Sequence, residues 1–240
     1  MKLTSFPLKA VCICITVCSF LAGHAQTNIE FHGIKINAVD KQKRKQGNWL
    51  FFDYDGMPVM SCVYKNDNCI SPAIFYEKGD TAFVRFPQTD SIETFIVYAG
   101  KDRMYGNFIH SSDSSTRVEV EQNPAMNDSV LAKINRYKDI VMEPVFYFAQ
   151  KKMVDFISAG ILSSHMNLNK PVTALLTISS SGLLTKVEFP QDKNNLSPDE
   201  ETEYNWIYSR MMRWQPCYRA NKTHERKVLL KNSRKLEWMN

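Results

Sequence analysis

The sequence predicts an α+β protein with an N-terminal antiparallel β-hairpin repeat domain and a C-terminal α-β-β-α-β domain that holds a three-stranded antiparallel sheet. In the first part, short aromatic runs are closed by turn sequences, which is typical of antiparallel hairpins. In the second part, two stretches with apolar residues at helical spacing flank strand-like runs. We expect a signal peptide at 1–25, a β-rich domain at 26–122, a linker with a short helix at 123–143 and a second domain at 144–240.

The first 25 residues have the pattern of a secretory signal peptide. Two lysines supply positive charge, an apolar stretch follows at 11–22, and small residues stand at Gly23 and Ala25. We therefore expect a mature chain that begins near Gln26 and a periplasmic or secreted location. A lipid-modified Cys18 is the competing interpretation, and the valine before it argues against that alternative. No segment reaches the roughly 20 apolar residues of a membrane-spanning helix.

The charge balance argues against a nucleic-acid-binding protein. The formal charge of the 240 residues is +5, and residues 1–25 hold two lysines and no acid, so 28 basic and 25 acidic residues leave +3 after cleavage. That is too even for binding of nucleic acid or a membrane surface by the whole protein. A chain of 27.7 kDa with 44% hydrophobic residues can form two modest domains with cores of their own.

Three cysteines remain after the predicted cleavage: Cys62, Cys69 and Cys217. In an oxidising compartment Cys62 and Cys69 are a candidate disulfide, with Cys217 left over, although two cysteines at this spacing are often simply two thiols. The Cys-x6-Cys spacing lacks the second pair of ligands that a zinc site needs. We therefore expect no metal and no cofactor.

Residues 41–87 carry the hairpin pattern. The aromatic run that begins at Trp49 ends at the turn before Gly56, and the run at Phe75 ends at Gly79. The two glycines are 23 residues apart, a period that suggests stacked hairpin repeats. Over 47–80, Gly-x-Trp and Tyr-x-x-Gly units resemble the MORN-like repeats that are common in exported bacterial proteins. The alternative is that these aromatic residues are only the core of a sheet.

The remaining elements follow from spacing, capping and turn residues. Ser197 is a predicted helix cap, Pro198 suits the first helical position, and Pro216 prevents a helix that reaches about Arg213 from continuing. Two strands meet at the turn Ser181-Gly182. The sequence predicts helices at 128–138, 150–162 and 198–213, and strands at 172–178, 183–189 and 226–236.

The second half contains the motifs Pro144-Val145-Phe146, the hairpin with Ser181-Gly182, Trp214-Gln215-Pro216, Asn221-Lys222 and a closing strand. In these motifs and in the order of its elements, it resembles the C-terminal domain of TonB, the periplasmic part of an energy transducer that contacts outer-membrane receptors. The chain lacks the membrane anchor and the proline-rich spacer of that family, so we do not expect it to transmit a membrane-derived force. Trp214 and Pro216 are most simply structural, an indole over the end of the sheet and a proline at the helix exit.

The resemblance implies that a partner peptide binds by strand addition. In this family the last strand lies at a sheet edge, and an extended peptide pairs with its open backbone groups. The expected partner is an envelope protein or a peptide of an outer-membrane receptor, and a second copy of the chain is a further candidate. Charges on this strand are equally explained as protection of an exposed edge against aggregation. The predicted edge consists of Arg226, Lys227, Val228, Leu229, Leu230 and Lys231.

The sequence contains no familiar catalytic signature. Gly-x-Ser-x-Gly, His-Glu-x-x-His and a phosphate-binding glycine loop are all missing from it. We therefore expect an exported, non-enzymatic, protein-binding adaptor of the cell envelope. The alternative is a structural or cell-wall-associated protein whose basic C-terminal tail, from Arg219 to Lys235, binds polyanions.

Overall fold

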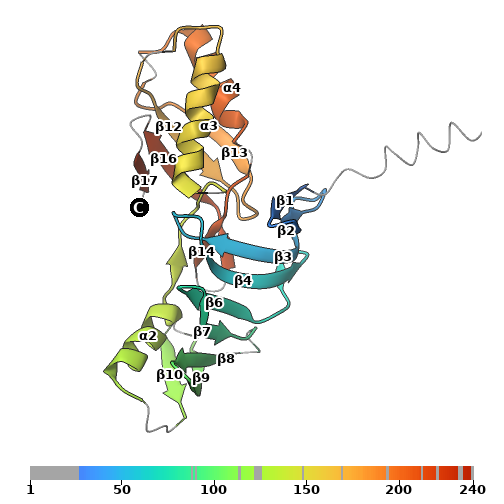
Figure 1. Cartoon of the computed structure of the whole chain (residues 1–240), viewed down its shortest axis with the longest axis vertical. Coiled ribbons are helices and arrows are strands. Elements are labelled where there is room, and N and C mark those ends of the chain that lie inside the picture. Colours follow the sequence, from blue (N-terminus) through green and yellow to red (C-terminus); the bar gives the residue numbers. More distant parts are fainter. Residues whose placement is uncertain are drawn as a thin grey trace, which may run out of the picture.

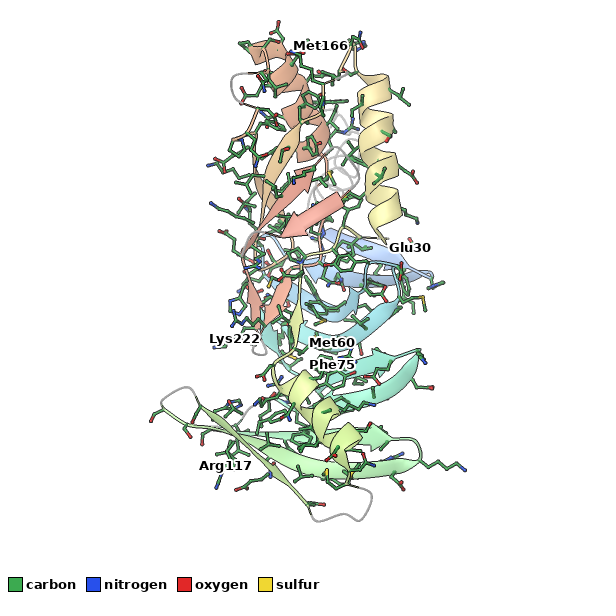
Figure 2. The ribbon with its side chains drawn as sticks, turned by 90° about the vertical axis from the view of Figure 1, so that its left-hand side faces the viewer. Glu30, Met60, Phe75, Arg117, Met166 and Lys222 are labelled. Carbon is green, nitrogen blue, oxygen red and sulfur yellow. The ribbon has the colours of Figure 1, made fainter. Side chains whose placement is uncertain are left out.

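The protein is elongated, with its two halves stacked along the long axis (Figure 1). In the view turned by 90°, Met166 and Arg117 lie near opposite ends and Met60 lies between them (Figure 2). The predicted signal peptide and Asn221 fall outside the described residues. The computed structural model describes residues 27–238 apart from 88, 90, 113–114, 122–125, 148, 169, 193–194, 212, 220–221 and 232–234.

The N-terminal half is one antiparallel sheet of ten strands, in which strands that follow one another in the chain pair with each other. This confirms the antiparallel sheet expected here, while the MORN-like repeat stays a prediction. The order is β1-β2-β3-β4-β6-β7-β8-β9-β10, with the short β5 paired to β4. The strands are β1 (Thr27–Phe31), β2 (Ile34–Val39), β3 (Lys45–Phe52), β4 (Pro58–Lys65), β5 (Asn68–Cys69), β6 (Ala73–Glu77), β7 (Asp80–Arg85), β8 (Ile92–Ala99), β9 (Asp102–His110) and β10 (Thr116–Val120).

One face of this sheet carries the N-terminal core. Side chains alternate between the two faces of a strand, so every second residue points the same way. In β8, for example, Glu93, Phe95 and Val97 are buried, and the residues between them are not. The same alternation in the neighbouring strands collects the large apolar side chains on one face. They include Trp49, Phe51, Met60, Phe75, Phe83, Met104 and Phe108.

Helix α2 (Asp128–Lys138) covers part of that face, next to β6–β10 (Figure 1). The helix begins where predicted, because the side chain of Asn127 accepts a hydrogen bond from the amide of Val130 at 3.1 Å. Val130, Ile134 and Tyr137 are buried in the N-terminal core, and the Tyr137 ring stacks on Phe83 with 4.8 Å between centroids. The helix predicted within the linker therefore packs as a layer of the first half.

A separate small sheet, built mainly from residues late in the chain, adds side chains to the N-terminal core. It consists of β11 (Val141–Met142), β14 (Cys217–Arg219) and β15 (Lys222–His224), in the order β11-β14-β15. Met142 and Tyr218 belong to the N-terminal core, and the Tyr218 ring lies 5.7 Å from that of Phe51. The sequence patterns did not predict this sheet, since its strands are only two or three residues long.

The C-terminal half has the expected order of elements. Its sheet has the order β13-β12-β16-β17, and the first two expected strands are present. The third, expected as one strand at 226–236, is instead a pair of antiparallel strands, so the sheet has four strands and not three. Ala174, Leu176, Val228 and Leu230 point from this sheet into a C-terminal core that also holds Trp214. The elements are α3 (Ala149–Ser163), β12 (Thr173–Ile178), β13 (Leu184–Glu188), α4 (Pro198–Ser209), β16 (Arg226–Lys231) and β17 (Lys235–Trp238).

Helix α4 begins as predicted and ends earlier than predicted. Ser197 and Glu200 form a reciprocal capping box at its start. The helix ends at Ser209 instead of near Arg213, because the chain then pairs with the β12–β13 turn. Arg213 forms a β-bridge with Leu183, and the amide of Trp214 donates to the carbonyl of Gly182 at 2.8 Å.

Gly182 is required at this crossing of two chain segments. Its φ of +74° is a left-handed conformation, and a Cβ built there would lie 2.0 Å from the carbonyl oxygen of Trp214. Gly47 has a similar φ of +67°, and a Cβ there would meet no atom within 4 Å. A substitution at Gly47 would therefore introduce backbone strain alone, whereas one at Gly182 would introduce strain and a steric overlap.

We predict that Gly182→Ala lowers the free energy of unfolding by roughly 3 kcal/mol or more, because overlap with a backbone atom adds to the strain of a left-handed alanine. The matched control Gly47→Ala carries the strain alone and should cost about 1 kcal/mol. Urea unfolding followed by tryptophan fluorescence measures both. Equal losses in the two variants would contradict the steric argument.

Candidate functional site

The predicted partner-binding strand lies inside the sheet, and this corrects its assignment as an edge. β16 pairs with β12 from Arg226 to Lys231 on one side, and with β17 from Val228 to Lys231 on the other. The physical reason is that the chain turns back after Lys231 and adds its own strand, so the backbone groups of Leu229 and Leu230 face paired strands on both sides. Val228 and Leu230 are core residues as well.

The edges of this sheet are β17 and β13. Among the residues that the structure describes, no strand pairs with the outer side of β17. On β13, Lys186 and Glu188 form a 2.8 Å ion pair, and the preceding Leu183 bridges to Arg213. Ion pairing with Lys186 keeps the pKa of Glu188 below its usual range. The two edges thus differ in what already contacts them.

The basic residues of the tail do not share one face. Arg226 is paired with Glu143 at 3.1 Å, and Lys222 lines a cavity described below. Lys227 and Lys231 lie on the face of β16 that turns away from the core residues Val228 and Leu230, because side chains alternate along a strand. The basic tail is thus divided between an ion pair, a cavity wall and a sheet face.

Trp214 and Pro216 are packing residues in their surroundings. Both are buried, and the indole lies edge-on to the ring of Phe146 with 5.5 Å between centroids. The indole N–H donates to the carbonyl of Met211 at 2.9 Å. A buried aromatic ring whose polar atom is satisfied by a nearby carbonyl is typical of a structural role.

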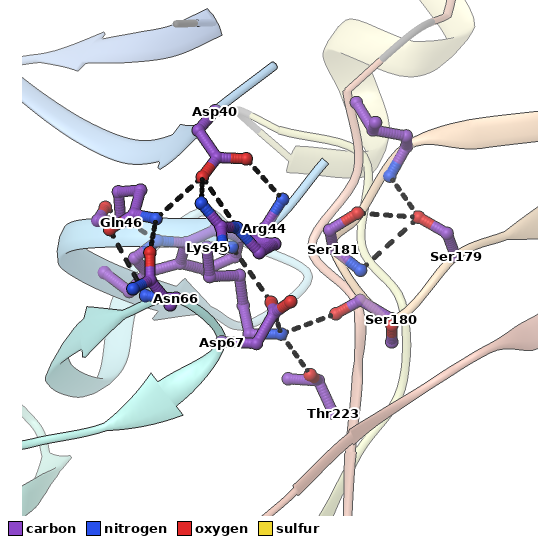
Figure 3. A network of polar contacts seen from close by, with 12 residues as sticks. Asp40, Arg44, Lys45, Gln46, Asn66, Asp67, Ser179, Ser180, Ser181 and Thr223 are labelled. Atoms are coloured by element: carbon purple, nitrogen blue, oxygen red, sulfur yellow. Dashed lines mark hydrogen bonds and ion pairs between the residues drawn. The ribbon is translucent and has the colours of Figure 1, made fainter. Parts of the chain in front are cut away.

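A buried lysine joins the two halves of the protein. The Lys45 side chain is 3% exposed, and its ammonium group donates to the Asp67 carboxylate at 2.8 Å, the Thr223 hydroxyl at 2.8 Å and the Ser180 carbonyl at 3.2 Å (Figure 3). All three N–H groups of the ammonium therefore have acceptors. Ser180 belongs to the β12–β13 turn and Thr223 to β15. We call the contact of these four residues the joint.

Gln215 and Asn37 each form a side-chain hydrogen bond between the same two halves and others within their own half. The Gln215 side chain accepts from the amide of Phe52, and its backbone amide donates to the carbonyl of Val145 at 2.8 Å. Asn37 hydrogen-bonds the backbone of Leu50 through both atoms of its amide, and also contacts the hydroxyl of Tyr147. Because these donors and acceptors are buried or half-buried, each lost partner would leave a polar group unsatisfied.

The joint borders a cavity of about 510 Å³ between the N-terminal sheet and the small sheet, which we call the joint cavity. Residues of both halves line it, so neither half forms it alone. Its wall includes Lys45, Cys62, Tyr64, Asp67, Cys69, Arg85, Glu93, Ser180, Tyr218, Lys222 and Thr223.

One wall of the joint cavity holds a buried ion pair. Arg85 and Glu93 face each other across β7 and β8 with contacts of 2.5 and 2.8 Å, and their side chains are 3% and 2% exposed. Arg85 also donates to the carbonyl of Tyr137 at 3.1 Å. His110 Nε2 lies 3.3 Å from Oε2 of Glu93, the oxygen that also accepts from Arg85 Nη2. A buried pair of this kind is stable only while each charge keeps its partners.

The opposite wall holds the two cysteines that the sequence marked as a candidate disulfide. Cys62 and Cys69 are free thiols in the structure, and both line the joint cavity. The neighbouring Cys62 lowers the pKa of Cys69 to about 7, and the neighbouring Cys69, together with burial, raises the pKa of Cys62. Burial also raises the pKa of the neighbouring Tyr64.

Two further classes of site are not found in the described part of the chain. It contains no group of three or more His, Cys, Asp or Glu side chains placed to hold a metal ion. It also contains no helix that is long and apolar enough to cross a membrane. Comparison with models of protein families, with curated proteins and with solved structures finds no match. The likenesses to TonB and to MORN repeats therefore remain predictions.

Sequence reasoning missed the buried charges, although the sequence contains a signal for them. Arg85 stands two residues after Phe83 in β7, and Glu93 stands two residues before Phe95 in β8. Residues two apart in a strand point to the same face, so both charged side chains point inward with these buried rings. Lys45 stands four residues before Trp49 in β3 and by the same alternation belongs to the same face of the strand. A charge at an apolar-face position marks a residue whose partner must come from elsewhere in the fold.

We predict that Glu93→Ala lowers the free energy of unfolding by about 3 to 5 kcal/mol, because it leaves the Arg85 guanidinium buried without its counter-charge. The control is Glu119→Ala, which breaks the exposed 2.6 Å pair with Arg117 and should cost less than about 1 kcal/mol. Denaturant midpoints at constant slope measure both changes. Similar losses in the two variants would contradict a buried ion pair.

Proposed function

We propose that this protein is an exported, non-enzymatic adaptor that captures an extended peptide of an envelope partner by strand addition at β17. The observation that carries the proposal is the outer side of β17, with which no described strand pairs. In an antiparallel pair, alternate N–H and C=O groups point away from the partner strand. Those of β17 are available to one more strand.

The sheet behind this edge is a suitable template for a peptide. β17 pairs with β16 over four residues, and β16 pairs with β12 over six. One face of this sheet carries the apolar residues of the C-terminal core. Helix α4 packs against that core with Tyr204, Ile207 and Tyr208. In strand addition the main chain supplies affinity and alternate side chains supply selectivity.

The second edge, β13, is less suitable. The residue before it already bridges to Arg213, and the ion pair of Lys186 and Glu188 lies on the strand itself. Each edge strand carries one lysine and one glutamate, so the contact with Arg213 is what distinguishes β13 from β17. We therefore assign the peptide to the β17 side.

The resemblance to the TonB domain supports the same side of the sheet. It implies a partner strand beside the last strand of the unit, and here the chain's own β17 occupies the outer side of β16. The partner strand would therefore pair with β17 and not with β16. The export of the adaptor rests on the N-terminal sequence, in which lysines precede an apolar stretch that ends at Gly23 and Ala25.

We predict that peptides from the periplasmic ends of outer-membrane receptors, titrated into the whole chain, shift amide resonances of β16 and β17 in a saturable way. Glu237→Pro on β17 should weaken binding at least tenfold, because proline removes a backbone donor and distorts the edge. The matched control Lys186→Pro, on the β13 edge, should leave affinity unchanged.

The outcomes separate the competing functions. Loss of binding in Lys186→Pro alone would move the site to β13, and no shift at millimolar peptide would reject strand addition. Binding of an anionic polymer with steep salt dependence, lost in a Lys227→Gln and Lys231→Gln double variant, would favour the polyanion alternative.

A further inference from the structure

Cys62 and Cys69 lie on the same face of a tight hairpin. The register of β4 and β5 places Tyr64 opposite Cys69 and Lys65 opposite Asn68. Cys62 stands two residues before Tyr64, so its side chain points to the same face as that of Cys69, in a diagonal cross-strand position. Both side chains line the joint cavity. Their geometry therefore brings two sulfur atoms together without a long flexible loop.

The two thiols differ in accessibility. Cys62 is buried with 5% exposure, while Cys69 is only partly buried. In its protonated form, the Cys69 S–H donates to the carbonyl oxygen of Ser71 at 3.2 Å. The neighbouring Cys62 lowers the pKa of Cys69 to about 7, below the usual value for a thiol, which favours its thiolate form. An accessible thiolate beside a buried thiol is the arrangement of an attacking and a resolving cysteine.

A substrate has room to reach this pair. Both cysteines line the joint cavity, whose volume of about 510 Å³ accommodates a small molecule or a side chain. The third cysteine offers a comparison, since Cys217 is buried on β14 and is not part of the cavity wall. Burial raises the pKa of Cys217, which makes it a poor nucleophile.

We propose that Cys62 and Cys69 form a redox-active dithiol site that exchanges two electrons with disulfides entering the joint cavity. The Cys69 thiolate attacks one sulfur of the incoming disulfide, forms a mixed disulfide and releases the first thiolate. Cys62 gives its proton to that thiolate and attacks the Cys69 sulfur, which releases the second thiolate, itself protonated from solvent. The cysteines are oxidised to a Cys62–Cys69 bridge, and the disulfide is reduced to two thiols.

The test uses the reduced whole chain and glutathione disulfide under native conditions, with acid quenching, alkylation and peptide mapping. A Cys62–Cys69 bridge should form and should be reversed by dithiothreitol without denaturant. Cys62→Ser and Cys62→Ala should accumulate a mixed disulfide at Cys69, because the resolving thiol is gone. In Cys69→Ser, mixed disulfide at Cys62 should form at least tenfold more slowly. Cys217→Ser should behave like the unaltered chain.

Other outcomes would overturn the proposal. A bridge that dithiothreitol reduces only in denaturant would be a structural disulfide. A mixed disulfide at Cys62 in Cys69→Ser, formed as fast as that at Cys69, would reject the assigned roles. Alkylation rates in the unaltered chain provide a test that needs no variant to fold, since Cys69 should react at least tenfold faster than Cys217. Equal rates would show that the hairpin does not activate Cys69.

Discussion

The burial of the Lys45 ammonium is the constraint on which the arrangement of the two halves depends. Removing an ammonium ion from water costs several kcal/mol unless acceptors replace the lost hydration. Asp67 comes from the same sheet, but Ser180 and Thr223 come from segments more than 130 residues later in the chain. Lys45 is therefore satisfied only when the β12–β13 turn and β15 are both docked on the N-terminal sheet.

The packing around the joint reinforces this dependence. Tyr218 from β14 inserts among the rings of the N-terminal core, and Gln215 accepts from the backbone of β3. The turn that supplies Ser180 is fixed in turn by Gly182, which allows Trp214 to approach its carbonyl. The segment 213–224 thus connects both cores. Treating the halves as independent domains would leave Tyr218 and Lys45 without their surroundings, even though each half has the periodicity of a separate unit.

Local patterns predicted what local interactions determine. The start of α4 was readable because Ser197 and Glu200 satisfy each other within one turn. The end of α4 was not, because it depends on contacts of Trp214 and Arg213 with residues near 182, about thirty positions away. The hairpins of the first half followed from aromatic runs and turns. The small sheet and β17 did not, since short strands gain their stability from pairing rather than from a periodic sequence.

The same distinction applies to the site. The predicted edge residues have the right character for a strand, and Val228 and Leu230 are inward-facing as their alternation requires. Whether a strand lies at an edge, however, depends on which strands pair with it. Here β17 pairs with β16, so β16 is an inner strand although its own sequence suits an edge. The thiol pair is the opposite case, because its geometry is set within one hairpin by the register of Tyr64 with Cys69. Sites made by neighbours in sequence can be read from sequence, whereas an edge is a property of the whole sheet.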